Sequence, residues 1–242
     1  MNFLRNKIQN RTIMIIVTFL SLILLIAVIL NAFKYYVAVQ PAFSQPIHRG
    51  SRESKGVAIT CNVDWGSEYL PAMLDIFETA GVKIAFFITG KWAEQNTELT
   101  RLIAEYGHTL GNHGYSHRDH SKLDYRQNKA EIARTQQILK EITGITPKYF
   151  APPSGAYNND TVKAAGDLGC EIIMWSIDTI DWKREGADRI ISRVEKKLHG
   201  GGIILMHPTD QTLEALPAII TNIKERGYQI ISLEDIVNSI DK

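Results

Sequence analysis

Two histidines four residues apart, His113 and His117, are the side chains of this sequence with the clearest capacity for chemistry. Imidazoles at this spacing can project from the same side of one helical turn and bind a single divalent metal ion. Asp64 offers a carboxylate as a third ligand. Two histidines and a carboxylate leave one coordination position open for water, as a hydrolytic metal requires. The alternatives are solvated turn histidines and, for Asp64, a turn residue at a strand end.

The elements that must position these side chains follow a repeating pattern from residue 56 onward. Helical segments that end in glycine precede short apolar runs, at 57–60, 82–88, 108–110, 149–150, 170–175, 203–206 and 228–231. Glycine after a helix is the usual left-handed cap, and alternating helices and strands predict parallel βαβ units. The runs are apolar at consecutive positions, so we expect both faces of the sheet to be covered. About seven strands favour a closed or nearly closed β/α barrel over an open doubly wound sheet.

Four polar side chains follow predicted strands of this pattern. Asp64, His113, Asp178 and His207 each come after the carboxyl end of an apolar run. Parallel α/β barrels and sheets build their active sites at that rim. The four residues are therefore expected to lie near one another.

The N-terminal part of the chain predicts a membrane anchor. Residues 1–11 carry Arg5, Lys7 and Arg11 and no acid, and residues 12–33 carry no charge. About 20 apolar residues cross a bilayer, whereas the apolar part of a cleaved signal has about 7–15. The nearest small-x-small triplet, at residues 42–44, lies well downstream, so an uncleaved single-pass anchor is favoured over a signal peptide. The basic flank places residues 1–11 in the cytoplasm and the remainder outside the cell membrane.

Residues 34–55 contain Pro, Gly, Ser and mixed charges without apolar periodicity and predict a linker, whereas residues 56–240 are even in composition and predict one domain. The N-terminal bases are three of 27 Lys and Arg residues, so the remainder carries 24 against 26 Asp and Glu. Such a surface does not favour nucleic acid as a partner, and we expect a monomer. Cys61 and Cys170 are expected to be buried as small apolar groups, with a bridge between them as the alternative.

Several segments together resemble the polysaccharide deacetylase family, also called the NodB-homology or carbohydrate esterase 4 domain. The similarity covers about residues 56–238, with motif-like segments at 112–117, 150–155, 175–182 and 204–208. The family fold is a distorted β/α barrel, so the resemblance implies a distorted (β/α)7 barrel here. It also implies a hydrolase that uses a bound divalent metal, often zinc, to remove acetyl groups from chitin-like, peptidoglycan or xylan-type sugars.

The resemblance also implies roles for individual residues. His207 matches the general acid, Asp181 the carboxylate that orients it, and Asp178 is expected to share that work. Turn formation and helix capping are the alternative for both carboxylates. The backbone N–H of Ser154, which follows Pro153, matches the oxyanion donor, and a backbone donor tolerates a change of its own side chain.

Two departures from the family pattern concern the catalytic base. Asn62 occupies the position of the base Asp, and Ala151 that of its Arg partner. The first motif is two residues longer here, so that Val63 falls at the ligand position and Asp64 is the nearest carboxylate. The two losses are chemically consistent, because an Arg keeps a carboxylate base ionised, whereas a neutral Asn carries no charge that needs a counter-ion. Asp64 could serve as base or as ligand, but not readily as both.

Aromatic side chains near the motifs are candidates for sugar binding. Trp182, Trp65 and Tyr157, beside Pro153, could line a groove for a pyranose, although ordinary core packing is the alternative. The sequence thus predicts a membrane-anchored, metal-dependent deacetylase of an extracytoplasmic glycan. The alternative is a family member that binds glycan and has lost catalysis.

Overall fold

The computed structural model describes residues 14–31 and 45–240, which belong to two separate compact units. The first unit contains the helix Met14–Asn31, whose apolar side chains are all exposed. Its two hydroxyls, Thr18 Oγ1 and Ser21 Oγ, each donate to a carbonyl of the same helix at 2.8 Å. By length and composition the helix can cross a membrane. The expected cytoplasmic segment and both ends of the predicted anchor lie outside the described residues.

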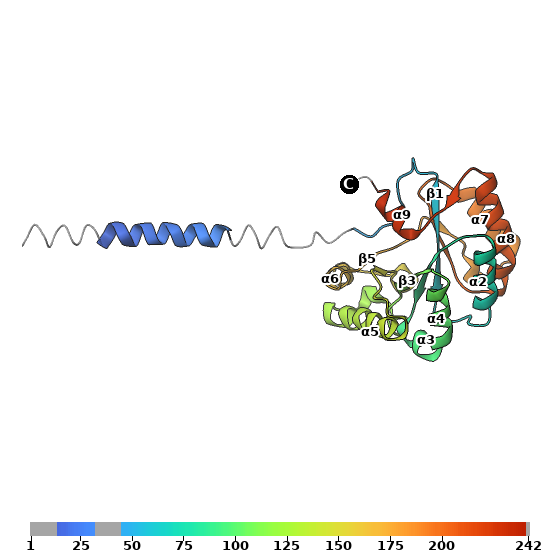
Figure 1. The fold of residues 1–242 in the computed structure, drawn as a ribbon, viewed down its shortest axis with the longest axis horizontal. Coiled ribbons are helices and arrows are strands. Elements are labelled where there is room, and N and C mark those ends of the chain that lie inside the picture. The colour runs from blue at the N-terminus through green and yellow to red at the C-terminus, as the bar shows by residue number, and fades with distance from the viewer. Residues whose placement is uncertain (1–13, 32–44, 241–242) are drawn as a thin grey trace, which may run out of the picture. The chain divides into compact units, whose positions relative to one another are not determined.

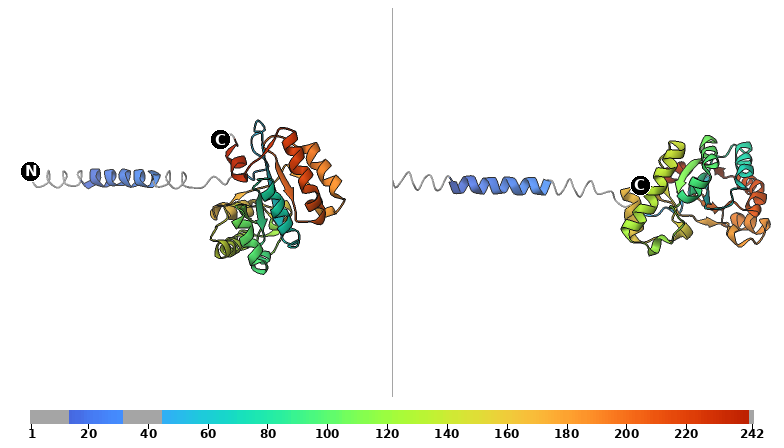
Figure 2. Two further views of the ribbon diagram at one scale, coloured as in Figure 1. Left: turned by 45° about the vertical axis from the view of Figure 1, so that its right-hand side comes forward. Right: turned by 90° about the horizontal axis from the view of Figure 1, so that it is seen from below.

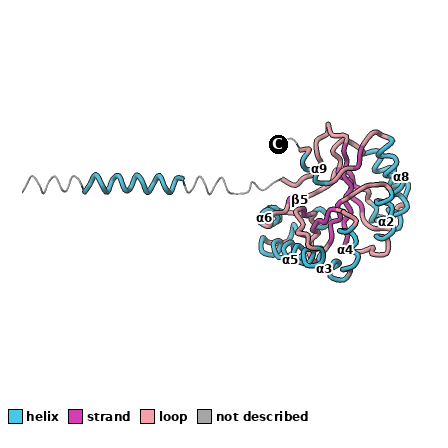
Figure 3. Tube along the Cα trace, in the orientation of Figure 1, coloured by secondary structure: helices cyan, strands magenta, loops and turns pink. Residues whose placement is uncertain are grey.

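The second unit is built on a parallel sheet of eight strands (Figure 1). The strands are β1 (Gly56–Val63), β2 (Ala85–Ile88), β3 (Thr109–Asn112), β4 (Tyr149–Phe150), β5 (Glu171–Ile172), β6 (Ile177–Asp178), β7 (Ile203–Met206) and β8 (Gln229–Ile230). Their order is β5-β4-β3-β2-β1-β7-β6, with β8 paired to β1. Figure 3 shows the strands at the centre of this unit with helices outside them. The sheet is a curled half-barrel of eight strands, which agrees with the predicted distorted α/β barrel type but has one strand more than predicted.

Strand β1 runs through the middle of the sheet and is buried along its whole length. Because side chains alternate along a strand, its residues serve two separate cores. Ala58 packs in a cluster with Phe87, Tyr149 and Ala151 inside the curled sheet. The odd-numbered residues of β1 pack on the other side, in the larger core with the surrounding helices.

Most helices cover the outside of the sheet, and the last one adds Leu233 and Ile236 to the inner cluster. The helices are α2 (Leu70–Thr79), α3 (Gly90–Gln95), α4 (Thr97–Glu105), α5 (Tyr125–Thr143), α6 (Asn159–Asp167), α7 (Ala187–Lys197), α8 (Asp210–Glu225) and α9 (Leu233–Asn238). Helices α7 and α8 lie side by side, as do α5 and α6 (Figures 1 and 2). Short 3-10 turns at His120–Lys122, Pro153–Gly155 and Asp181–Lys183 lie in the connections.

Helix α5 is fixed at both ends by local interactions. Asp124 accepts a hydrogen bond from Gln127 N at 2.8 Å, and Gln127 Oε1 accepts one from Asp124 N at 3.2 Å. This reciprocal capping box satisfies backbone groups that the first turn leaves free. The helix ends at Gly144, whose φ of 77° is the left-handed cap that glycine adopts without steric cost. The side chains that α5 sends towards the sheet are therefore held in a defined register.

The structure differs from the sequence prediction at the start of the domain. Ile47, predicted within the linker, forms a parallel bridge with Ile173, and Arg49 forms an antiparallel bridge with Gly202. Residues near 45–50 thus pair both beyond β5 and before β7. The polar composition of residues 45–50 did not predict these bridges, because an isolated β-bridge requires no apolar periodicity in the sequence.

Two further differences concern short elements and cysteines. Strand β6 was not predicted, and Asp178 lies within it rather than after a strand. A two-residue strand carries too little pattern to be recognised. Cys61 and Cys170 are both free and buried. Burial raises the pKa of the Cys170 thiol to about 12, so it stays protonated near neutral pH.

Candidate active site

Three of the predicted site residues follow the carboxyl ends of strands in the central part of the sheet. Asp64 follows β1, His113 follows β3 and His207 follows β7. Strands β2 and β7 flank β1, and β3 lies beyond β2. The parallel register brings these three strand ends to the same rim.

His207 and Asp181 form a complete hydrogen-bonded pair. The Nδ1–H of His207 donates to Asp181 Oδ1 at 2.7 Å, and the backbone N–H of His207 donates to Oδ2 at 2.6 Å. Thr212 Oγ1 also donates to Oδ2 at 2.8 Å. The Asp181 carboxylate is fully buried and holds the imidazole in one tautomer, with Nε2 left to exchange protons. This arrangement suits a general acid.

Asp178 has a different role in the structure. Its Oδ1 accepts a hydrogen bond from Ile180 N at 2.8 Å, which stabilises the turn that leads to Asp181. Ile180 itself adopts a left-handed φ of 54°. Among the described residues no hydrogen bond joins Asp178 to His207. The structure therefore supports the turn-forming alternative for Asp178, because its carboxylate is used two residues along the chain.

The His113–His117 segment is an irregular turn and not the helical turn that the spacing predicted. Gly114 and His117 have φ values of 73° and 54°, which lie outside the right-handed helical region. The two rings nevertheless meet, with centroids 5.1 Å apart. The turn thus brings the imidazoles together by a different route from the predicted one.

His113 has the environment of a metal-binding imidazole. Its Nδ1–H donates to Ala151 O at 2.7 Å, which fixes the tautomer and leaves the Nε2 lone pair available. Burial, together with the neighbouring His117, lowers the pKa of His113 well below its usual 6.5. The ring is therefore neutral near pH 7, as a metal ligand must be. His117 is exposed beside it.

The third predicted ligand is not in place. Asp64 Oδ1 accepts a hydrogen bond from Thr89 Oγ1 at 2.7 Å, at the start of α3. Within residues 14–31 and 45–240, no group of three or more His, Cys, Asp or Glu side chains is arranged to hold a metal ion. Two imidazoles thus fit a divalent metal, but the predicted three-ligand set is not assembled. Among the described residues, the Asp64 carboxylate bonds to Thr89 rather than joining the two imidazoles.

The base position lies inside the sheet and has no base. Asn62 is 5% exposed, and its Oδ1 has no hydrogen-bond partner among the described residues. Ala151 is buried among apolar side chains of the inner cluster, where a guanidinium would be costly. An unpaired buried amide oxygen costs on the order of 1–3 kcal/mol. This half of the site therefore retains a polar position without the partners that would make it catalytic.

The remaining predicted site residues lie around the rim. Ser154 is exposed and adopts a left-handed φ of 55°, directly after buried Pro153. Trp182 is 56% exposed and Tyr157 is 36% exposed. The partial exposure of these aromatic rings supports their availability to a ligand rather than burial in the core.

Trp65 lies beside the proton-donor pair. The Trp65 ring is 40% exposed and nearly parallel to that of His207, with centroids 6.1 Å apart and planes inclined by 7°. The next residue, Gly66, has a φ of 80°, and a Cβ there would lie 2.1 Å from Pro208 O. Only glycine lets the Trp65 loop approach the His207 loop this closely.

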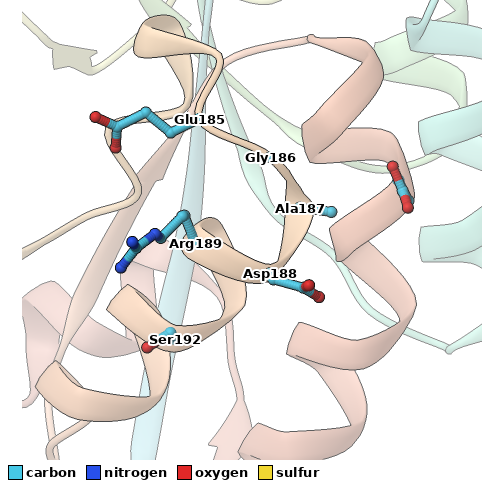
Figure 4. Close-up of a pocket in the computed structure, with 7 residues that line it drawn as sticks. Glu185, Gly186, Ala187, Asp188, Arg189 and Ser192 are labelled. Atoms are coloured by element: carbon cyan, nitrogen blue, oxygen red, sulfur yellow. The ribbon is translucent and has the colours of Figure 1, made fainter.

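A separate surface cavity of about 610 Å³ lies between the N-terminal parts of α7 and α8 (Figure 4). It is lined by Glu185, Gly186, Ala187, Asp188, Arg189, Ser192 and Glu214. None of the predicted site residues lines it, and its lining lacks a histidine or an aromatic ring. The predicted site residues therefore lie outside this cavity.

Two residues that were not predicted from the sequence form hydrogen bonds to the predicted site segments. Thr212 binds Asp181, and Glu131 of α5 accepts hydrogen bonds from Tyr115 N and Ser116 N. Both residues lie on helices distant in sequence from the motif that they contact. In the sequence, each residue resembles an ordinary residue of an amphipathic helix, so no local pattern marked it as part of the site.

Comparison with known proteins identifies the same family. Residues 49–173 match the family described as polysaccharide deacetylase. The chain is 39% identical over 194 residues to the uncharacterized protein YlxY of Bacillus subtilis, which covers 80% of this chain and 61% of YlxY. It is 33% identical over 197 residues to a peptidoglycan-N-acetylglucosamine deacetylase of Bacillus cereus, covering 79% and 70%. The matched region is thus less than two thirds of YlxY.

A solved structure gives the same fold. The crystal structure of BA3943, described as a CE4 family pseudoenzyme from Bacillus anthracis, superposes with a TM-score of 0.79 at 38% identity, covering 82% of this chain and 70% of that one. The motif-bearing rim, the parallel sheet and these similarities agree. The chain belongs to the polysaccharide deacetylase family, carbohydrate esterase 4, which includes both the Bacillus cereus deacetylase and the Bacillus anthracis pseudoenzyme.

Proposed function

We propose that this chain is a deacetylase of acetylated glycan outside the cell membrane, with N-acetyl sugars of the peptidoglycan type as substrate. The observation that carries the proposal is the His207–Asp181 pair. The buried Asp181 carboxylate accepts two hydrogen bonds from His207 and a third from Thr212. The names of the Bacillus cereus relative and of the Listeria monocytogenes PgdA proteins support this substrate class.

The proposed role of His207 follows from its hydrogen bonds. Amide hydrolysis requires a proton donor for the departing amine. With Nδ1 bonded to Asp181, the other ring nitrogen, Nε2, is the atom that would give the proton. Asp181 would stabilise the charged imidazolium that precedes this transfer. Ser154 N–H is proposed as the oxyanion donor, because a turn after two prolines can fix a backbone N–H in place.

We propose that a divalent ion, zinc, is held by His113 and His117, with Asp64 as the third ligand after rotation away from Thr89. The neutral, oriented His113 ring supports the first part of this assignment. When bound, such an ion would supply an activated water and polarise the acetyl carbonyl. We further propose that the helix Met14–Asn31 anchors a monomer in the membrane, which its length and apolar composition support.

The base position limits the expected rate. Asn62 accepts no proton, and loss of a general base costs roughly 10²–10⁴-fold. The test uses the full chain in detergent micelles, with bound metal measured by elemental analysis and acetate release measured from an N-acetylglucosamine oligomer. We expect about one divalent ion per chain and slow, metal-dependent release. Absence of release with zinc, cobalt and manganese on several acetylated glycans would contradict the proposal.

A second candidate function is glycan binding without turnover. Three observations on the described residues favour it: Asn62 Oδ1 has no partner among them, Ala151 packs against apolar side chains, and no three of them form a metal-binding group. The similarity to a protein described as a pseudoenzyme supports the same view. In this case the rim would retain its aromatic side chains for sugar while hydrolysis is lost.

A double substitution, Asn62→Asp with Ala151→Arg, separates the two candidates. It adds a carboxylate base and a cation that can keep it ionised. If the unmodified chain binds the oligomer and releases no acetate, and the double variant releases it, glycan binding is the function. If the unmodified chain already releases acetate and the double variant is about 10²-fold faster, the deacetylase proposal is supported.

A further inference from the structure

The three residues between the two histidines have their backbone N–H groups fixed by buried side chains. Gly114 N donates to Asn112 Oδ1 at 2.8 Å. Tyr115 N and Ser116 N both donate to Glu131 Oε2, at 2.9 and 2.8 Å. Each N–H of the turn therefore has a defined acceptor, which is unusual for an exposed irregular segment.

Both acceptors are tied to helix α5. Glu131 belongs to it, and Asn112 Nδ2 donates to Ile132 O at 2.8 Å. Glu131 is only 9% exposed, and its second oxygen accepts from Ser116 Oγ at 2.9 Å. Adjacent positions of one helix thus fix the path of the chain from His113 to His117.

Side-chain contacts add to this attachment. The guanidinium of Arg134, one turn after Glu131 on α5, lies 3.4 Å from the centre of the Tyr115 ring. Tyr115 Oη donates to Glu94 at 2.9 Å. Immediately after this fixed stretch, His117 adopts its left-handed φ of 54°. That conformation is costly for a non-glycine residue and persists only where neighbouring contacts impose it.

We propose that Glu131 is a positioning residue that sets the spacing of the His113 and His117 rings, and thereby the affinity of this pair for a divalent ion. The inference rests on the proposed function, because it assigns the ion to these two imidazoles. Glu131 acts through geometry: its carboxylate reaches the turn from α5 and accepts both N–H groups. Its negative charge is secondary, since the acceptors needed are oxygen atoms at the right place.

Two conservative variants test the length and the charge of the Glu131 side chain separately. Glu131→Gln keeps the length and one carbonyl oxygen for the two N–H groups, and its amide can donate to Ser116 Oγ. Glu131→Asp keeps the charge but withdraws the oxygens by one methylene. Glu141→Asp is the matched control, because Glu141 is exposed on the same helix and its side chain bonds only to Gln137 among the described residues.

The experiment titrates each full-length variant in detergent with zinc chloride and measures the Kd by calorimetry, after circular dichroism confirms folding. Changes in residues that orient metal ligands typically cost 10–100-fold in affinity. We expect Glu131→Asp to raise the Kd about 10-fold or more, and Glu131→Gln and Glu141→Asp to stay within about 3-fold of the unmodified chain. Equal losses in Glu131→Asp and Glu131→Gln, or no loss in Glu131→Asp, would overturn the inference.

A second measurement keeps the inference separate from the proposed function. Nuclear Overhauser contacts between the two imidazole rings are recorded on metal-free protein, where they should be present in the unmodified chain and in Glu131→Gln but weakened in Glu131→Asp. If the unmodified chain binds no zinc, the proposed metal site fails, and these ring contacts alone decide the inference. Should Glu131→Asp not fold, Glu131→Gln decides: its ring contacts should equal those of the unmodified chain, and their loss would overturn the inference.

Discussion

The two halves of the rim differ in how completely their polar groups are satisfied. On the proton-donor side, the buried Asp181 carboxylate accepts three hydrogen bonds, two of them from His207. On the neighbouring strand β1, Asn62 Oδ1 has no hydrogen-bond partner among the described residues, and Asp64 bonds to Thr89 instead of joining the histidines. From this difference we expect the proposed acid chemistry to be preorganised and the proposed nucleophile chemistry not to be.

This contrast explains why both candidate functions are compatible with one fold. The donor half is also a structural unit, because Asp181 links the loop after β7 to Thr212 on α8. It would therefore be retained by a protein that only binds glycan. Its presence alone does not measure activity, and the experiments that follow separate its chemical from its structural role.

The largest expected effect is on Asp181. Asp181→Asn should reduce acetate release by roughly 10²–10⁴-fold, because the imidazole loses the carboxylate that orients and charges it. Asp178→Asn is the matched control, since Asp178 bonds to Ile180 in the adjacent turn. Release is measured from an N-acetylglucosamine oligomer, with urea unfolding in parallel. Equal rates in Asp181→Asn and the unmodified chain would show that the donor half is structural only.

An intermediate effect is expected for the exposed tryptophan beside His207. Trp65→Ala should weaken binding of the same oligomer about 10-fold, since an aromatic contact contributes roughly 0.5–1.5 kcal/mol beyond its buried area. Trp65→Phe keeps an aromatic ring and should lose about 3-fold or less. Binding is followed by calorimetry, which reports affinity whether or not hydrolysis occurs. If Trp65→Ala binds as tightly as the unmodified chain, the glycan does not lie against this half of the rim.

The smallest effect concerns the stability of the domain away from the rim. The pH dependence of unfolding must be known before a pH profile of activity can be assigned to the rim. Burial lowers the pKa of His108 from 6.5 to about 4. Between these values the unfolded chain binds a proton there that the folded protein does not, so the free energy of unfolding should fall as pH drops from about 6.5 to 4. Urea unfolding at several pH values measures this slope.

The variant His108→Asn supplies the control for that slope. The asparagine carbonyl can replace Nδ1 as the acceptor for Ile84 N but does not titrate in this range. Its unfolding free energy should therefore depend less on pH, although it starts lower because a buried ring is lost. An unchanged slope would locate the pH dependence in other groups, with His113 the first to be tested.

Local pattern predicted the elements that are long or wholly apolar. Strand β7 occupies the predicted residues 203–206, because four consecutive apolar residues after three glycines are typical of a buried strand. The two-residue strand β6 was missed for want of any pattern. Residues 45–50 were missed because backbone bridges, not side chains, place them in the fold.

The candidate site was predictable by residue type and less so by geometry. The meeting of His113 and His117 followed from their spacing, but the turn that produces it depends on Glu131, 15 residues further along the chain. Asp64 was a reasonable third ligand until its contact with Thr89, 25 residues away, was visible. Long-range hydrogen bonds of this kind leave no periodic signal in a sequence.

The bridges of Ile47 and Arg49 have a practical consequence for handling this protein. A truncated protein that starts at Gly56 would lack Ile47. The backbone groups Ile172 O and Met174 N would then lose the hydrogen bonds that they form with Ile47. Bare strand edges are templates for aggregation, so a version intended for purification should begin at or before Gln45. Proteolytic cleavage just after these bridges would therefore both separate the domain from the N-terminal helix and leave an opened, aggregation-prone sheet.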